Sequence, residues 1–241
     1  MASTNIYNFR NGKAADADMR RHLSEEGLKR LTDVRLDDLF IYTDTDEIQK
    51  PEILTFLKLY DGVPHIVSFY YKWSIYGFFW QVDSSVHGAI KTFEKSAVTI
   101  QFFRDFYSYD ASHIRSDDYK TSLGMLRKYA TRNESIGPLN IGNGGWHCSW
   151  CFKPEGIQRK LLDAPNSDFP RYGDYPGKTE TKYITRLIKH GLYFDMSHLR
   201  NDSGVNQTID AEFAPPYVLD NRQQFQYLLE NPYENVDLPK A

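Results

Sequence analysis

Five segments of the chain carry apolar residues at helical spacing, and each predicts a helix. They are residues 17–32, 51–60, 154–162, 179–189 and 222–229. In the first segment, Met19, Leu23 and Leu28 fall on one side, with charged residues opposite. The second begins at Pro51, and proline suits a first helical turn because its missing N–H needs no partner there.

Other segments are rich in β-branched and aromatic residues, which favours strands. They are residues 37–43, 64–73, 77–82 and 97–103, and a short strand is expected after Pro138. Residues 37–43 form an apolar run that fits a buried strand and stops abruptly at an acidic stretch. Residues 1–16 are expected to be irregular. Strands mixed with helices predict an α/β or α+β fold.

The composition narrows the classes of function. The chain has 241 residues, which is enough for a sizeable core, and a formal net charge of -3. A near-neutral chain argues against a nucleic-acid partner, since phosphate binding needs an excess of Lys and Arg. No segment approaches the roughly 20 apolar residues that span a bilayer.

Two acidic residues, Asp44 and Asp46, directly follow the first predicted strand and precede a helix. In open α/β sheets, ligands bind at the carboxyl ends of strands. Two carboxylates there repel each other unless a cation lies between them, and a divalent cation held together with substrate phosphate oxygens is the usual arrangement. The alternative is a solvated turn that caps the helix.

A compact aromatic block contains one histidine and both cysteines of the chain. His147 is either a metal ligand or proton-transfer group, or a histidine packed among aromatic rings, and spacing alone favours packing. Cys148 and Cys151 have no second pair, which excludes a four-thiolate zinc site within one chain. They are either two buried thiols or a local disulfide in an oxidising compartment.

Aromatic residues are also dense over residues 73–80. Trp73, Tyr76 and Trp80 either stack on a sugar or form the core of a sheet, and the core is favoured for most of them. Trp146 is a further candidate for substrate contact.

Four carboxylates are candidates for a general base, and nothing in the sequence selects among them. They are Glu47, Glu155, Asp168 and Asp174.

Several blocks occur together in the order and at the spacing of one known family. They lie at residues 37–48, 56–62, 76–80, 145–157, 168–175 and 228–233, and include Trp146-His-Cys-Ser-Trp-Cys-Phe-Lys153. On these blocks the chain resembles glycosyltransferase family 17, from about residue 13 to Tyr233. The resemblance implies an α/β fold of the GT-A-like kind, with a mixed central sheet flanked by helices, and one catalytic domain over residues 1–241.

The resemblance also implies an activity. GlcNAc would pass from UDP-GlcNAc, with inversion, to a β-1,4 linkage on the core mannose of N-glycans. Two alternatives stay open: a family member with another donor or acceptor, and a truncated glycan-binding protein without activity.

By the same resemblance, Asp44 and Asp46 hold a divalent cation, usually Mn²⁺, on the donor diphosphate. His147 is expected as a third ligand, by analogy of fold and position. Glu47, Asp168 and Asp174 are the base candidates kept for this reaction.

Some family features are expected to lie outside this sequence. Family members are Golgi membrane proteins with a signal anchor and an early strand that contacts the nucleotide. We expect this chain to lack that N-terminal part, to touch a membrane only through a segment outside it, and to bind the nucleotide weakly. Gln49 stands where the family commonly has proline.

Overall fold

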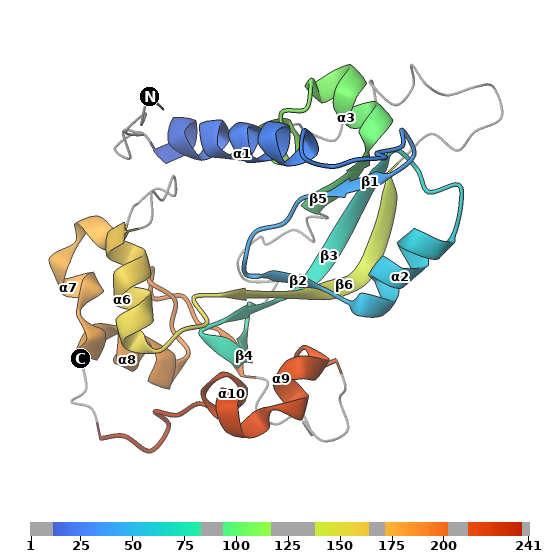
Figure 1. Ribbon diagram of the computed structural model, residues 1–241. Helices are drawn as coiled ribbons and strands as arrows, with labels where there is room; N and C mark the ends of the chain where they lie inside the picture. The colour runs from blue at the N-terminus through green and yellow to red at the C-terminus, as the bar shows by residue number, and fades with distance from the viewer. Residues whose placement is uncertain (1–11, 83–93, 117–137, 164–171, 202–211, 238–241) are drawn as a thin grey trace. The chain divides into compact units, whose positions relative to one another are not determined.

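The computed structural model describes residues 12–82, 94–116, 138–163, 172–201 and 212–237 (Figure 1). The chain divides into two compact units, each assembled from separate stretches of sequence. The first unit comprises Met1–Asp44, Glu52–Tyr70 and Phe93–Asn143, and the second comprises Thr45–Pro51, Tyr71–Thr92 and Gly144–Ala241.

In the first unit, helices pack on antiparallel strands. Its helices are α1 (Gly12–Leu28), α2 (Pro51–Leu59), α3 (Ile100–Tyr107) and α4 (Ser112–Ser116), and its strands are β1 (Leu39–Ile41), β5 (Glu94–Thr99) and the beginning of β3 (Ile66–Ile75). β5 pairs antiparallel with both β1 and β3. The core joins Ile66 and Val98 of the strands to Phe102 and Phe103 of α3.

The second unit holds the ends of β3 and β6 (Leu139–Ser149) together with further short strands. These are β2 (Glu47–Gln49), β4 (Gly77–Gln81) and β7 (Arg200–Asn201). β2 pairs antiparallel with β6, and β4 pairs antiparallel with β3 and β7. Its helices are α6 (Pro154–Asp163), the 3-10 helix η1 (Tyr172–Asp174), α7 (Pro176–Thr179), α8 (Thr181–His190), α9 (Pro216–Asp220) and α10 (Arg222–Leu229).

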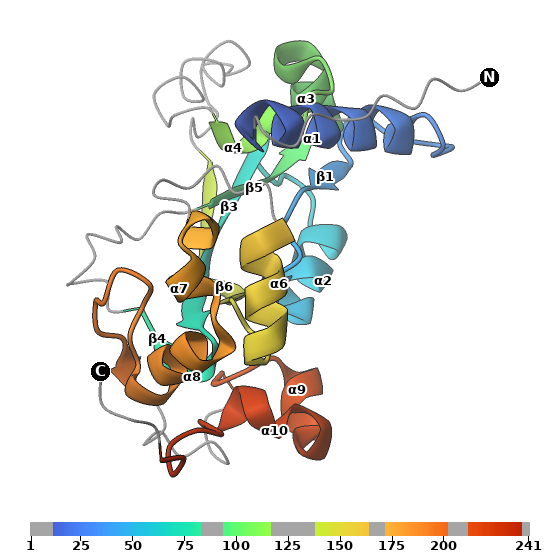
Figure 2. The ribbon, with the colours of Figure 1, turned by 90° about the vertical axis from the view of Figure 1, so that its left-hand side faces the viewer.

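The hydrophobic strand β4 is buried on both faces, which explains its continuous apolar sequence. Phe79 and Trp80 pack with Ile184 and Leu187 of α8. Phe78 packs in a separate cluster with Leu228 of α10. Figure 2 shows α6, α7 and α8 gathered together, and α9 beside α10.

Most of the predicted elements are confirmed. The helices over 51–60, 154–162 and 222–229 correspond to α2, α6 and α10. The α/β class with a sheet flanked by helices is confirmed as well. The first helix, however, begins at Gly12, inside the region expected to be irregular, and ends at Leu28.

The strand predicted over residues 97–103 is wrong beyond Thr99. The Thr99 side chain accepts a hydrogen bond from the backbone N–H of Phe102 and so caps α3. The apolar residues that follow belong to the buried face of a helix. Among the described helices, none combines the length and apolar character needed to cross a bilayer.

Candidate functional site

The backbone of the second unit places Asp46 beside His147. Asp46 directly precedes β2, and the next residue, Glu47, is paired across the strands with His147. The backbone N–H of Cys148 donates to the carbonyl of Asp46 at 2.9 Å. Gly145 makes this close approach feasible, because a Cβ at this position would lie 2.0 Å from the carbonyl oxygen of Ile48. The two segments are therefore held by main-chain geometry.

The Asp46 carboxylate contacts two cationic or potentially cationic side chains. Its Oδ1 lies 3.7 Å from Nε2 of His147, and its Oδ2 lies 3.3 Å from Nζ of Lys160. The side chain of Asp46 is 25% exposed and that of Lys160 is 33% exposed. We call Asp46, His147 and Lys160, with Ser149 and Trp73, the Asp46 cluster.

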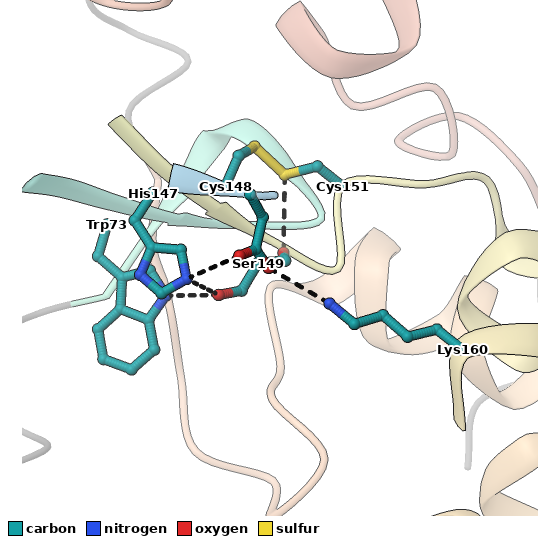
Figure 3. The surroundings of a disulfide bond; sticks show 7 residues. Trp73, His147, Cys148, Ser149, Cys151 and Lys160 are labelled. Carbon is teal, nitrogen blue, oxygen red and sulfur yellow. Dashed lines mark hydrogen bonds and ion pairs between the residues drawn. A yellow bond between two sulfur atoms is a disulfide. The ribbon is translucent and has the colours of Figure 1, made fainter. Parts of the chain in front are cut away.

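Ser149 and Trp73 extend the cluster along β6 and β3 (Figure 3). Ser149 Oγ lies 2.9 Å from His147 Nε2, and the indole N–H of Trp73 donates to Ser149 Oγ at 3.0 Å. The Trp73 and His147 rings are stacked, with centroids 5.6 Å apart and planes 8° apart. Trp73 is 39% exposed, so part of its ring is open to a ligand.

The arrangement differs from a Ser-His-Asp triad. In such a triad the serine and the aspartate contact different nitrogens of the imidazole. Here both Ser149 Oγ and Asp46 Oδ1 approach Nε2 of His147. The geometry therefore suits the binding of a ligand or cation better than activation of Ser149 as a nucleophile.

A disulfide lies in the turn that connects β6 to α6. Cys148 and Cys151 are bonded, which decides between the two readings of this pair in favour of the local disulfide. Within the bridge, Trp150 adopts a left-handed backbone conformation, with φ of 59°. The bridge thus fixes the turn from the strand that carries His147 to the helix that carries Lys160.

Three of the aromatic residues named from the sequence as candidates for substrate contact are buried. They are Tyr76, Trp80 and Trp146, at 1%, 8% and 2% exposure. Their polar atoms donate to the carbonyls of Leu192, Ile188 and Glu212 respectively. Buried Tyr and Trp usually find such partners. Of the proposed aromatic contacts, Trp73 alone is substantially exposed.

Comparison with known proteins supports a single family. A model described as Glycosyltransferase family 17 matches residues 3–106. Proteins named beta-1,4-mannosyl-glycoprotein 4-beta-N-acetylglucosaminyltransferase are 39% identical in Rattus norvegicus and Mus musculus over 229 residues, and 38% identical in Homo sapiens over 230. The chain is a relative of the family 17 glycosyltransferases.

The alignments cover a larger share of this chain than of its relatives. Each alignment covers 92% of this chain but only 40% or 41% of the relative. The chain thus spans about two fifths of the length of these curated relatives. The resemblance inferred from the sequence blocks is confirmed, and no solved structure matches the chain.

The residues expected to bind a metal in this family 17 relative belong to both compact units. Asp44 belongs to the first unit, where its carboxylate lies 3.5 Å from a guanidinium nitrogen of Arg20. Asp46 and His147 face each other in the second unit. Ligands about 2.1 Å from one metal lie about 3–4 Å apart, so this carboxylate–imidazole pair fits two positions of a divalent-cation site. Within the described stretches, no group of three His, Cys, Asp or Glu suited to a metal is present.

The candidates for the catalytic base lie in different environments. Glu47 is buried, at 5% exposure. Glu155 is exposed at the start of α6, and Asp174 is exposed at the end of η1. Asp168 lies outside the described residues. The assignment of the base remains a prediction.

Sequence reasoning missed two members of the cluster. Ser149 stands inside the aromatic block, but a lone serine gave no signal beside His147 and the cysteines. Lys160 lies on the predicted helix over residues 154–162, and the helical pattern did not reveal that it reaches Asp46. The contact also depends on the pairing of β2 with β6, which sets Asp46 beside the strand that leads into this helix.

Proposed function

We propose that this chain carries part of the catalytic machinery of an N-acetylglucosaminyltransferase. The reaction moves GlcNAc from UDP-GlcNAc to a β-1,4 linkage on the core mannose of N-glycans, with inversion. The observation that carries the proposal is the pairing of Asp46 with His147 in a chain that is 39% identical, over 92% of its length, to transferases named for this linkage.

The chemistry of the Asp46 cluster supports a nucleotide-sugar donor. A carboxylate and an imidazole are ligands suited to Mn²⁺, and a bound divalent cation supplies Lewis-acid stabilisation of a departing diphosphate. Asp46 and His147 would hold that cation. Lys160 provides a positive charge beside Asp46. A lysine ammonium group binds phosphate as a point charge.

The exposed part of Trp73 supports sugar binding. Trp73 is held in place by its stacking on His147 and by its N–H bond to Ser149. An aromatic ring fixed beside a diphosphate site presents a flat apolar surface to a sugar ring. We assign the GlcNAc of the donor to this surface, because Trp73 contacts the residue that faces Asp46.

The base would take the proton of the attacking mannose 4-hydroxyl as UDP leaves. Of the two retained candidates that the structure describes, Asp174 is exposed, whereas burial of Glu47 argues against direct contact with an acceptor. We propose a Golgi lumenal location, which the disulfide supports because disulfides persist in oxidising compartments.

A transfer assay tests the proposal. The purified chain is incubated with UDP-GlcNAc, Mn²⁺ and a biantennary N-glycan, and the product is examined by mass spectrometry and linkage analysis. The proposal predicts a product heavier by one GlcNAc that is β-1,4-linked to the core mannose. Another linkage or acceptor would replace the substrate assignment, and binding of the glycan without transfer would favour a glycan-binding protein.

A further inference from the structure

The position expected for a divalent cation is next to a side chain that already neutralises Asp46. Lys160 Nζ lies 3.3 Å from Oδ2 of the carboxylate whose Oδ1 faces His147. A dication bound at Oδ1 and an ammonium at Oδ2 would be only a few ångströms apart. At about 4 Å, like charges repel measurably even in water, and more strongly at a partly buried site.

The ammonium of Lys160 has a second partner close by. Nζ lies 4.9 Å from the centroid of the Trp150 ring, and that ring is buried at 7% exposure. A cation over the face of a tryptophan is stabilised by the ring quadrupole. Trp150 itself is fixed between Cys148 and Cys151 of the disulfide. Lys160 can therefore leave the carboxylate without losing all of its stabilisation.

We propose that Lys160 is a built-in counter-ion of Asp46 that a divalent cation must displace, and that the displaced ammonium remains over Trp150, available to an anionic ligand. The inference rests on the proposed metal role of Asp46 and His147 and adds a function for a residue outside the acidic motif. In the absence of metal, Lys160 offsets the charge of Asp46. When metal is bound, it supplies a second positive charge for the diphosphate.

Metal affinity, measured without donor, tests this inference. Binding of Mn²⁺ alone is followed by the electron paramagnetic resonance signal of the free ion, for the parent chain and for Lys160→Met and Lys160→Arg. Methionine keeps an unbranched side chain over Trp150 and removes the charge. Lys153→Met is the matched control, since Lys153 also lies over an aromatic ring, that of Tyr227, and the substitution changes the net charge equally.

The proposal predicts that Lys160→Met binds Mn²⁺ about tenfold more tightly than the parent. Lys160→Arg and Lys153→Met should stay within about twofold of the parent, because arginine keeps the competing charge and Lys153 has its ring contact at Tyr227 instead. Unchanged or weaker Mn²⁺ binding by Lys160→Met would overturn the proposal, as would a parent and Lys160→Met that both fail to bind Mn²⁺.

A second measurement covers the case in which Lys160→Met folds poorly. In an Asp46→Asn background Mn²⁺ loses a carboxylate ligand, so Lys160→Arg and Lys160→Gln should both bind Mn²⁺ weakly. In the chain that keeps Asp46, Lys160→Gln should bind Mn²⁺ about tenfold more tightly than Lys160→Arg. Equal Mn²⁺ affinities of these two variants when Asp46 is kept would overturn the proposal. Transfer activity is scored separately, so tighter Mn²⁺ binding without transfer would contradict the proposed function and leave the role of Lys160 intact.

Discussion

Asp46 Oδ1 lies 3.7 Å from His147 Nε2, although the two residues come from distant parts of the sequence. Their proximity follows from the antiparallel pairing of β2 with β6, which sets Glu47 opposite His147. The side chains therefore meet because of main-chain register. Changes in this register should affect binding at the Asp46 cluster more than changes to exposed positions elsewhere.

Gly145 should be essential for that register. It pairs with Gln49, has φ of 154°, and has no room for a Cβ because Ile48 O and Gln49 Cα lie within 3 Å of that position. We expect Gly145→Ala to lower the free energy of unfolding by about 3 kcal/mol, measured by urea denaturation.

Gly142→Ala is the control for this prediction. Gly142 lies on the same strand, and no atom lies within 4 Å of a Cβ built there. Its substitution should change the free energy of unfolding by less than about 0.5 kcal/mol. Equal effects of the two substitutions would contradict the packing described for Gly145.

The disulfide should contribute modestly to stability. It joins residues with a sequence separation of 3, and a bridge that closes so short a loop removes little entropy from the unfolded chain. We expect the double variant Cys148→Ser, Cys151→Ser to lose about 2 kcal/mol of unfolding free energy.

Reductant provides the matched comparison for the disulfide. It should lower the melting temperature of the parent and leave that of the double variant unchanged. The chain contains two cysteines, so the unreduced parent should also carry no thiol that reacts with an alkylating reagent under denaturing conditions. Labelling of both cysteines in the unreduced parent would contradict the bond.

Trp73 should contact the sugar of the donor. Trp73→Ala removes the exposed ring that stacks on His147. We expect it to weaken binding of UDP-GlcNAc about three- to tenfold in calorimetric titration and to leave binding of UDP almost unchanged. Trp73→Phe, which keeps a ring and loses the N–H bond to Ser149, should show a smaller loss.

Tyr217→Ala serves as the control for Trp73. Tyr217 is an aromatic residue of the same unit that is 66% exposed, on α9. Its substitution should leave the binding of UDP-GlcNAc and of UDP unchanged. If Trp73→Ala weakened the binding of UDP as much as that of UDP-GlcNAc, the assignment of the ring to the sugar would be wrong. The ring would then contact the nucleotide or only support His147.

The main elements could be predicted because their sequence signals are local. The helix starting at Pro51 and the helix over residues 222–229 have helical spacing and clear ends, and β4 is a continuous apolar run. β2 could not be predicted, since three residues carry no period and depend on β6 for their pairing. Residues 100–103, the first half of α3, were predicted as strand because the capping role of Thr99 depends on its conformation.

The site could be predicted only in part. Asp46 and His147 were candidates because carboxylates and imidazoles are metal ligands, and the structure brings them together. Asp44 was grouped with Asp46 by its spacing, yet its carboxylate is paired with Arg20 of α1. Among the aromatic residues, the sequence could not separate exposed Trp73 from buried Tyr76 and Trp80, since burial depends on tertiary packing.

In the proposed function, the carboxylate of Asp46 binds the divalent cation of the donor site. The most direct measurement is calorimetric titration of UDP-GlcNAc, with and without Mn²⁺, into the parent, Asp46→Asn and Asp163→Asn. Asp163 is an exposed carboxylate of α6 paired with Arg159, so its variant controls for the loss of a charge. We predict Mn²⁺-dependent binding by the parent and Asp163→Asn, and binding at least tenfold weaker by Asp46→Asn while near-UV circular dichroism shows it folded. Equal, Mn²⁺-dependent binding by all three proteins would contradict this role of Asp46.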